Sequence, residues 1–133
     1  MKYYLGIDCS KYKVHIAVLN EASELVKLDV ISSIEKKDIE RMWELKNKFE
    51  DWIIDFTNNI NDLIVEDLVV IVEEIDWDNY SKDILGKIAI NLVCIELSVP
   101  IKNKTIKLLR DYPEKCKKEY IKAFCLAKEK DIK

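Results

Sequence analysis

The first residues of the chain constrain the fold most strongly, because they combine an apolar strand with a single carboxylate. The run Tyr3-Tyr4-Leu5-Gly6-Ile7-Asp8-Cys9-Ser10 is followed, after a short polar turn, by Val14-His15-Ile16-Ala17-Val18-Leu19. This pattern predicts two strands of one sheet. A carboxylate inside an apolar strand is costly to bury unless it is hydrogen-bonded or binds a metal. Asp8 is therefore the first candidate for a functional residue.

A second strand with a carboxylate at its end occurs near the middle of the chain. The apolar run Leu68-Val69-Val70-Ile71-Val72 ends in Glu73-Glu74. Two strands that each carry a carboxylate at the C-terminal end suggest a divalent-metal site. Successive strand residues point to opposite faces, so only one of Glu73 and Glu74 can share a site with Asp8.

Length and composition favour one globular domain, residues 1–133, and exclude several other classes. No apolar run approaches the ~20 residues that a membrane span needs, and Asp8 interrupts the first apolar stretch before it could serve as a signal peptide. The four cysteines form no CxxC pair. We therefore expect reduced thiols and a cytoplasmic location. A zinc site is not expected, because His15 is the only histidine and lies in a strand.

Charge is distributed unevenly along the chain. Residues 1–101 hold 11 Lys/Arg and 20 Asp/Glu, a net charge of −9, whereas residues 102–133 hold 11 and 5, a net charge of +6. A basic C-terminal segment on an acidic body is typical of a segment that faces phosphates, although a solvated helix face has the same composition.

The pattern of apolar residues predicts an α/β domain with the order β-β-β-α-β-α-β-α. Ser32 with Glu35 fits a capping box at the start of the first helix, Ser81 can cap the second, and Pro113 suits the first turn of the third. A hairpin meander followed by crossover-connected strands predicts a mixed sheet. The expected strands are 3–9, 14–20, 25–31, 67–75 and 100–108. The first expected helix starts at Ser32 or Ser33, and the other two span 81–97 and 113–129.

The order of these elements and the two carboxylates resemble the RuvC-like branch of the ribonuclease-H-like superfamily, the Holliday-junction resolvases. Four pieces of sequence carry the resemblance in the family's order across nearly the whole chain. They are Leu5-Gly6-Ile7-Asp8-Cys9-Ser10 with Ile16-Ala17-Val18-Leu19, Val69-Val70-Ile71-Val72-Glu73-Glu74, Ile84-Leu85-Gly86-Lys87-Ile88 through Val99-Pro100-Ile101, and Lys117-Lys118-Glu119-Tyr120-Ile121.

The resemblance implies a three-layer ribonuclease-H-like fold with a mixed five-stranded sheet. It also implies a homodimeric endonuclease that resolves four-way or other branched DNA by two-metal phosphodiester hydrolysis, with Mg²⁺ or Mn²⁺ as cofactor. Asp8 and Glu73 would be catalytic metal ligands. Glu73 is preferred to Glu74 because it directly follows the apolar run, as the family's glutamate does.

The resemblance also implies residues that contact DNA. Trp77 and Tyr80 would stack on bases of the opened junction, although Trp77 covering the start of a helix is an equal alternative. Lys117 and Lys118 would contact DNA from the basic segment. Residues 88–95 are apolar almost all round, which suits either a dimer partner or burial within the monomer.

The C-terminus departs from the family's pattern. RuvC-like enzymes place further carboxylates on one more helix, and that final catalytic helix is missing from the predicted order. Glu129 and Asp131 lie in a charged tail, so the family's remaining ligands are not assigned to them. An alternative function is therefore a catalytically incomplete RuvC-like module that binds nucleic acid or protein. A fragment of an actin-like sugar kinase is less compatible, because no glycine follows Asp8 to cradle a phosphate.

Overall fold

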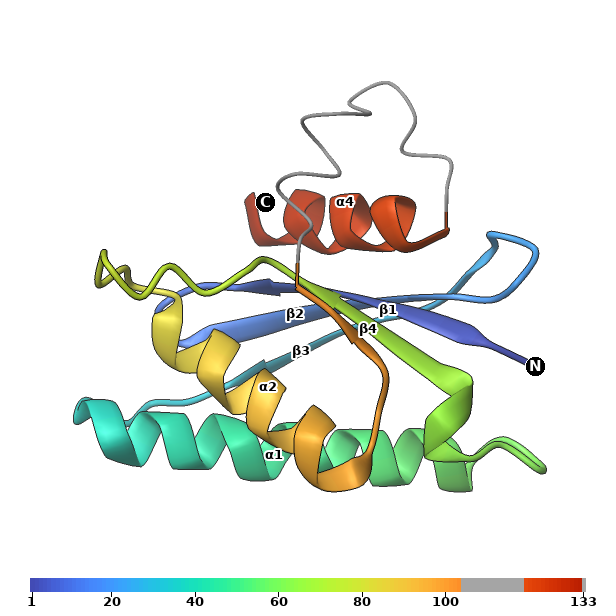
Figure 1. Cartoon of the computed structure of the whole chain (residues 1–133), viewed down its shortest axis with the longest axis horizontal. Coiled ribbons are helices and arrows are strands. Elements are labelled where there is room, and N and C mark those ends of the chain that lie inside the picture. Colours follow the sequence, from blue (N-terminus) through green and yellow to red (C-terminus); the bar gives the residue numbers. More distant parts are fainter. Residues whose placement is uncertain (104–118, 133) are drawn as a thin grey trace.

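The computed structural model describes residues 1–103 and 119–132, which form a mixed five-stranded sheet with helices on both faces (Figure 1). The sheet order is β3-β2-β1-β4-β5, with β3, β2 and β1 antiparallel and β1, β4 and β5 parallel. This is the predicted ribonuclease-H-like architecture. The strands are β1 (Tyr3–Cys9), β2 (Lys13–Leu19), β3 (Leu25–Ser32), β4 (Leu68–Val72) and β5 (Ile101–Lys102), and the helices are α1 (Asp38–Asn58), α2 (Ile84–Leu97) and α4 (Glu119–Ile132).

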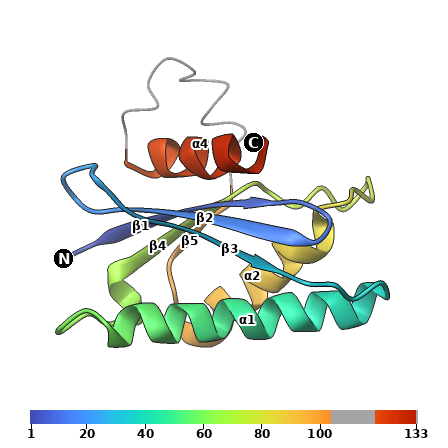
Figure 2. The same ribbon diagram turned by 180° about the vertical axis from the view of Figure 1, so that it is seen from behind.

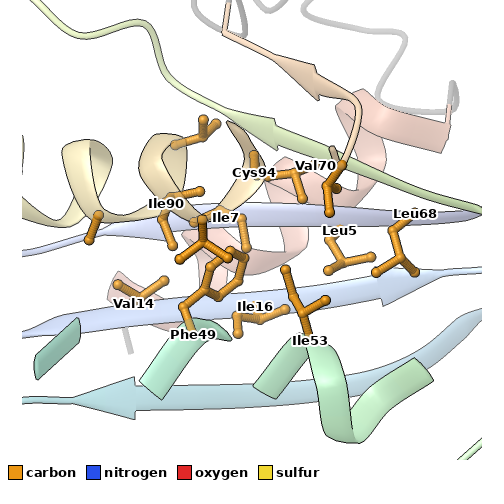
Figure 3. Close-up of a cluster of buried hydrophobic side chains, with 14 of the residues drawn as sticks. Leu5, Ile7, Val14, Ile16, Phe49, Ile53, Leu68, Val70, Ile90 and Cys94 are labelled. Atoms are coloured by element: carbon orange, nitrogen blue, oxygen red, sulfur yellow. The ribbon is translucent and has the colours of Figure 1, made fainter. Parts of the chain in front are cut away.

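The main hydrophobic core lies between the sheet and the layer formed by α1 and α2 (Figures 1 and 2). Strand residues that point to this face alternate with residues that point to the other, as the pleat requires. Figure 3 shows the centre of this core, where Phe49 and Ile53 of α1 and Ile90 of α2 meet side chains of β1, β2 and β4. These helix residues are fully or almost fully buried.

Helix α4 covers the opposite face of the sheet, mainly over β1 and β2 (Figure 2). Phe124 of α4 packs with Val69 and Ile71 of β4, and Tyr4 lies against this smaller cluster. A Cβ atom added to Gly6 would lie 2.0 Å from the backbone carbon of Ala123. The absence of a side chain at Gly6 therefore allows α4 to lie directly on the backbone of β1.

The start of the first helix differs from the prediction. Helix α1 begins at Asp38 with Lys37 as N-cap, and no side chain caps it. Ser32 belongs to β3, where it pairs with Lys13, and the Ser33 hydroxyl accepts a hydrogen bond from the Glu35 amide 3.1 Å away. The predicted capping box is therefore wrong, because Ser32 belongs to β3 and the helix starts six residues later, at Asp38.

The other predicted boundaries hold to within a few residues where the structure describes them. Strand β4 is shorter than 67–75, because a 3₁₀ turn formed by Val65–Asp67 precedes it and the strand ends at Val72. Helix α2 begins at Ile84 with Asp83 as N-cap, so Ser81 is not the cap. Most of the predicted strand 100–108 and the start of the predicted helix 113–129 lie outside the described residues, and α4 continues to Ile132. None of the helices in the described part is long and apolar enough to cross a membrane.

The contact between Gly6 and α4 predicts that Gly6→Ala destabilises the protein. The new methyl group would push the α4 backbone off the sheet, and overpacking of this kind costs about 1–3 kcal/mol. Chemical denaturation followed by circular dichroism measures the loss in the free energy of unfolding. Adding Ala123→Gly should not restore stability, because the clash is with the backbone of Ala123; full restoration would contradict the packing described here.

Candidate active site

The candidate site lies where the parallel strands β1 and β4 end. The last paired residues of these strands are Ile7 and Val72, so Asp8 and Glu73 follow at equivalent positions on neighbouring strands. Gly6 and Ile71 contact the α4 layer, and the pleat therefore directs Asp8 and Glu73 to this same face. Asp8 is only 8% exposed. The structure brings these two predicted residues together.

Glu74 points away from this pair. It is exposed and lines a groove of about 410 Å³ on the other side, together with Trp77 and residues of α2. Glu73, and not Glu74, therefore shares the face of Asp8.

Two lysines engage the carboxylate of Glu73. The Nζ atom of Lys87 in α2 lies 3.6 Å from Glu73 Oε2, and the Nζ atom of Lys128 in α4 lies 3.7 Å from Oε1. Lys87 is buried, whereas the side chain of Lys128 is half exposed. Each oxygen of Glu73 therefore has an ammonium group beside it, contributed by a different layer of the fold.

Lys87 also connects Glu73 to a third carboxylate. Its Nζ lies 3.0 Å from Asp83 Oδ2, one helical turn earlier. Burial opposes the charged form of Asp83, but hydrogen bonds from Ser81 and Lys87 outweigh it and lower the pKa of the carboxyl. Burial likewise opposes the charged form of Lys87, but the hydrogen bond and charge of Asp83 and the charge of Glu73 raise its pKa. Both groups are held ionised.

The pKa of the Cys9 thiol responds to the charged groups around the strand ends. Burial raises the pKa of its thiol well above the usual value, and the charges of Asp8, Asp83 and Glu73 raise it further, while Lys87 lowers it. Three carboxylates and one ammonium group are thus close enough to act on one sulfur atom. The raised pKa favours the protonated thiol, which is a weaker nucleophile than the thiolate.

Several residues of this cluster were missed by the sequence analysis. His15 lies directly across from Asp8 in the β1–β2 pairing and is buried beside it. Its strand position was noted, but not its place opposite Asp8. Asp83 and Lys87 stand four residues apart on a helix, a spacing typical of ion pairs that could have marked them. No sequence signal links Lys128 to Glu73, because that contact depends on how α4 lies across the sheet.

The two aromatic candidates lie on the loop between β4 and α2. Trp77 is 72% exposed and Tyr80 is 69% exposed. The Asp76 carboxylate accepts hydrogen bonds from the Asp78 amide and the Asn79 side chain, which shapes the loop. The Tyr80 hydroxyl donates a 2.7 Å hydrogen bond to Asp38 at the start of α1. Neither aromatic ring is buried under a helix. The other two predicted DNA-binding residues, Lys117 and Lys118, lie outside the described residues.

The chemistry of the donors suits a hard cation, but their number is small. Among residues 1–103 and 119–132, no group of three or more His, Cys, Asp or Glu side chains is arranged to hold a metal ion. Mg²⁺ is commonly held by only one or two carboxylates together with substrate phosphates and water. Asp8 and Glu73 fit that pattern, provided that a cation displaces the ammonium groups now beside Glu73.

The position of Lys87 predicts that Lys87→Met lowers stability at neutral pH. The variant leaves two partly buried carboxylates without their shared partner, and breaking a buried pair costs about 3 kcal/mol. The pKa of Asp83 is lowered from 3.8. The stabilisation is therefore complete above that value and is lost as pH falls through the lower folded-state pKa.

Denaturation at several pH values measures this effect. Lys82→Met removes an exposed lysine from the loop just before α2 and should change the free energy of unfolding by no more than about 0.5 kcal/mol. A deficit for Lys87→Met that persists unchanged in strong acid would contradict an ionic origin.

Comparison with known proteins identifies the fold. No family model matches the sequence, and no curated protein matches it. Among solved structures, Thermus thermophilus RuvC in complex with a Holliday junction substrate is similar over 96% of this chain and 90% of that chain, with a TM-score of 0.58 and 13% identity. Another structure of Thermus thermophilus RuvC is similar over 76% of this chain and 62% of that chain, with a TM-score of 0.52 and 16% identity. The chain therefore has the ribonuclease-H-like fold in the form seen in RuvC.

Proposed function

We propose that this protein is a metal-dependent endonuclease that acts on four-way or other branched DNA. The observation that carries the proposal is the placement of Asp8 and Glu73 on one face, at the ends of adjacent parallel strands. The structure that is similar over 96% of this chain is of RuvC in complex with a Holliday junction substrate, which supports the proposal. An actin-like kinase fragment receives no such support, since the turn between Asp8 and Lys13 contains no glycine that could cradle a phosphate.

In this proposal Asp8 and Glu73 hold Mg²⁺ or Mn²⁺. A bound divalent cation would supply charge neutralisation at the phosphodiester and lower the pKa of an attacking water. The carboxylates contribute hard oxygen donors from a rigid sheet, and the remaining positions are left to phosphate oxygens and water.

The two lysines would contribute in different ways. Lys128 lies on the surface of α4 with a half-exposed side chain, so it can leave Glu73 and bind a DNA phosphate. Lys87 is buried and stays paired with Asp83 when Glu73 changes partner. Lys87 would thus limit repulsion among the carboxylates before and after a cation binds.

The DNA would also contact the loop between β4 and α2. Trp77 and Tyr80 present exposed rings there, and aromatic rings stack on unpaired bases. Lys117 and Lys118 would add phosphate contacts from the basic segment. A homodimer would match the symmetry of a four-way junction, and a cytoplasmic location remains our expectation.

A second candidate function is junction binding without cleavage. It is favoured by the two ammonium groups beside Glu73 and by the lack of a third suitable ligand among the described residues. A site neutralised by lysines could bind branched DNA as a recognition module. The two functions differ in whether Mg²⁺ converts binding into cutting.

The nuclease proposal predicts that Asp8→Asn abolishes cutting while it preserves binding. Removing one ligand charge should slow cleavage about 100-fold or more, since a metal ion contributes several kcal/mol to the transition state. Cleavage of a labelled four-way junction, with and without Mg²⁺ or Mn²⁺, measures the rate, and a gel-shift assay measures binding. Glu74→Gln is the matched control, because Glu74 points away from Asp8.

The possible outcomes separate the two functions. Metal-dependent cutting that is lost in Asp8→Asn and kept in Glu74→Gln supports a nuclease. Tight junction binding without cutting by the unaltered chain favours the recognition module. Normal cutting by Asp8→Asn would overturn the assignment of the site.

The exposed loop predicts a separate effect on DNA affinity. Trp77→Ala should weaken junction binding about tenfold, since a base stacked on an aromatic ring contributes about 1–3 kcal/mol. Trp43→Ala, which removes a partly exposed ring from α1, is the control and should leave binding unchanged. Equal losses in both variants would argue against a specific role for Trp77.

A further inference from the structure

The edge of the sheet formed by β3 carries an unusual apolar surface. Leu25, Val26, Leu28 and Val30 are each between 43% and 47% exposed, although β3 is eight residues long. Figure 2 shows β3 as the outermost strand on its side, next to β2. No described segment pairs with its outer edge. A long exposed edge with apolar side chains is a template for pairing with another strand.

The direction of the backbone groups on this edge follows from the β2–β3 register. The Ser33 amide donates to the Tyr12 carbonyl at 2.8 Å, which marks a hydrogen-bonded pair next to Lys13 and Ser32. Hydrogen-bonded and non-hydrogen-bonded pairs alternate in an antiparallel ladder. Leu28 and Val30 are therefore in non-hydrogen-bonded pairs, and their N–H and C=O groups point outward.

A side-chain hydrogen bond also indicates that the Val30 N–H group points away from β2. The Val30 amide donates a 2.8 Å hydrogen bond to the Asp29 carboxylate instead of to β2. The same carboxylate accepts a hydrogen bond from the Trp52 indole and lies 3.8 Å from the Lys27 ammonium group. Asp29 thus covers one outward amide in the isolated chain.

The sequence of β3 is self-complementary about Leu28. The segment Leu25-Val26-Lys27-Leu28-Asp29-Val30-Ile31 places residues of matching character at equal distances on either side of Leu28. Valine stands at both positions two residues away, and a large aliphatic residue stands at both positions three residues away. One residue away, however, lysine stands on one side and aspartate on the other.

From this surface we infer that β3 pairs antiparallel with β3 of a second copy of the chain, about a two-fold axis at Leu28. In that register Lys27 lies opposite Asp29 of the partner subunit, and each side contributes one such pair. Leu28 lies opposite the partner's Leu28, with its outward N–H and C=O groups positioned for reciprocal hydrogen bonds. Lysine on an edge usually opposes pairing, but here each lysine meets an opposite charge.

Two features limit the strength of the pairing. The β2–β3 ladder is irregular near Val18 and Leu19, opposite Val26, so bonds at that end are less regular. The Asp29 carboxylate must also release the Val30 amide. We therefore expect a moderate-affinity dimer, and this inference does not depend on nuclease activity. It also differs from pairing through α2, where exposed Ile95 offers another apolar surface.

Sedimentation equilibrium of the full chain over a wide range of concentrations tests the inference. We expect a monomer–dimer equilibrium that Lys27→Asp or Asp29→Lys weakens at least tenfold, since each variant places like charges opposite one another. Mixing the two variants restores both opposite-charge pairs, so the mixture should form a heterodimer of unaltered affinity. This rescue separates charge pairing from damage to the fold, because Asp29→Lys also removes the bond to Trp52.

Two further variants complete the design. Leu28→Pro removes an amide that points outward, so it should weaken the dimer and leave the monomer folded. Ile95→Asp, on α2, should leave the dimer intact. A chain that is monomeric at every concentration, or a dimer broken by Ile95→Asp but not by the β3 variants, would overturn the inference. Failure of the mixture to associate would overturn the proposed register.

Discussion

The parallel pairing of β1 with β4 is the interaction on which the rest of the structure depends. Its register, with Ile7 beside Val72, places two carboxylates next to each other that are far apart in the sequence. The remaining strands join on either side of this central pair, and both helical layers pack against it. A shift of one residue would direct Glu74 rather than Glu73 to the face of Asp8.

The close approach of α4 to β1 has an electrostatic consequence. Because Gly6 has no side chain, α4 lies directly on the strand that carries Asp8. This position brings Lys128 to Glu73, while α2 brings Lys87 from the opposite layer. The charge on the candidate site is therefore set by both layers of helices, although the carboxylates come from the sheet alone.

Elements that local sequence patterns determine could be predicted, whereas contacts between residues far apart in the sequence could not. Strand β1 and the apolar run of β4 were correctly predicted because local periodicity and burial select the same conformation there. The start of α1 was mispredicted because Ser32 is part of β3, opposite Lys13, and this pairing between strands outweighs a local cap. The lysines beside Glu73 and the histidine opposite Asp8 were not predicted, since tertiary packing and strand register create those contacts.

In the proposed chemistry, a cation would have to displace the ammonium groups that lie beside Glu73. Three carboxylates act on the thiol of Cys9, and carboxylates this close repel one another unless cations neutralise them. Lys87 and Lys128 supply that neutralisation, so a divalent cation must compete with them for Glu73. A DNA backbone would draw the half-exposed Lys128 toward a phosphate and free one oxygen of Glu73. By linkage, DNA would then raise the affinity for the cation, and the cation would raise the affinity for DNA by the same factor. In the proposed enzyme the lysines would thus favour assembly of the metal site on bound DNA over assembly in the free protein.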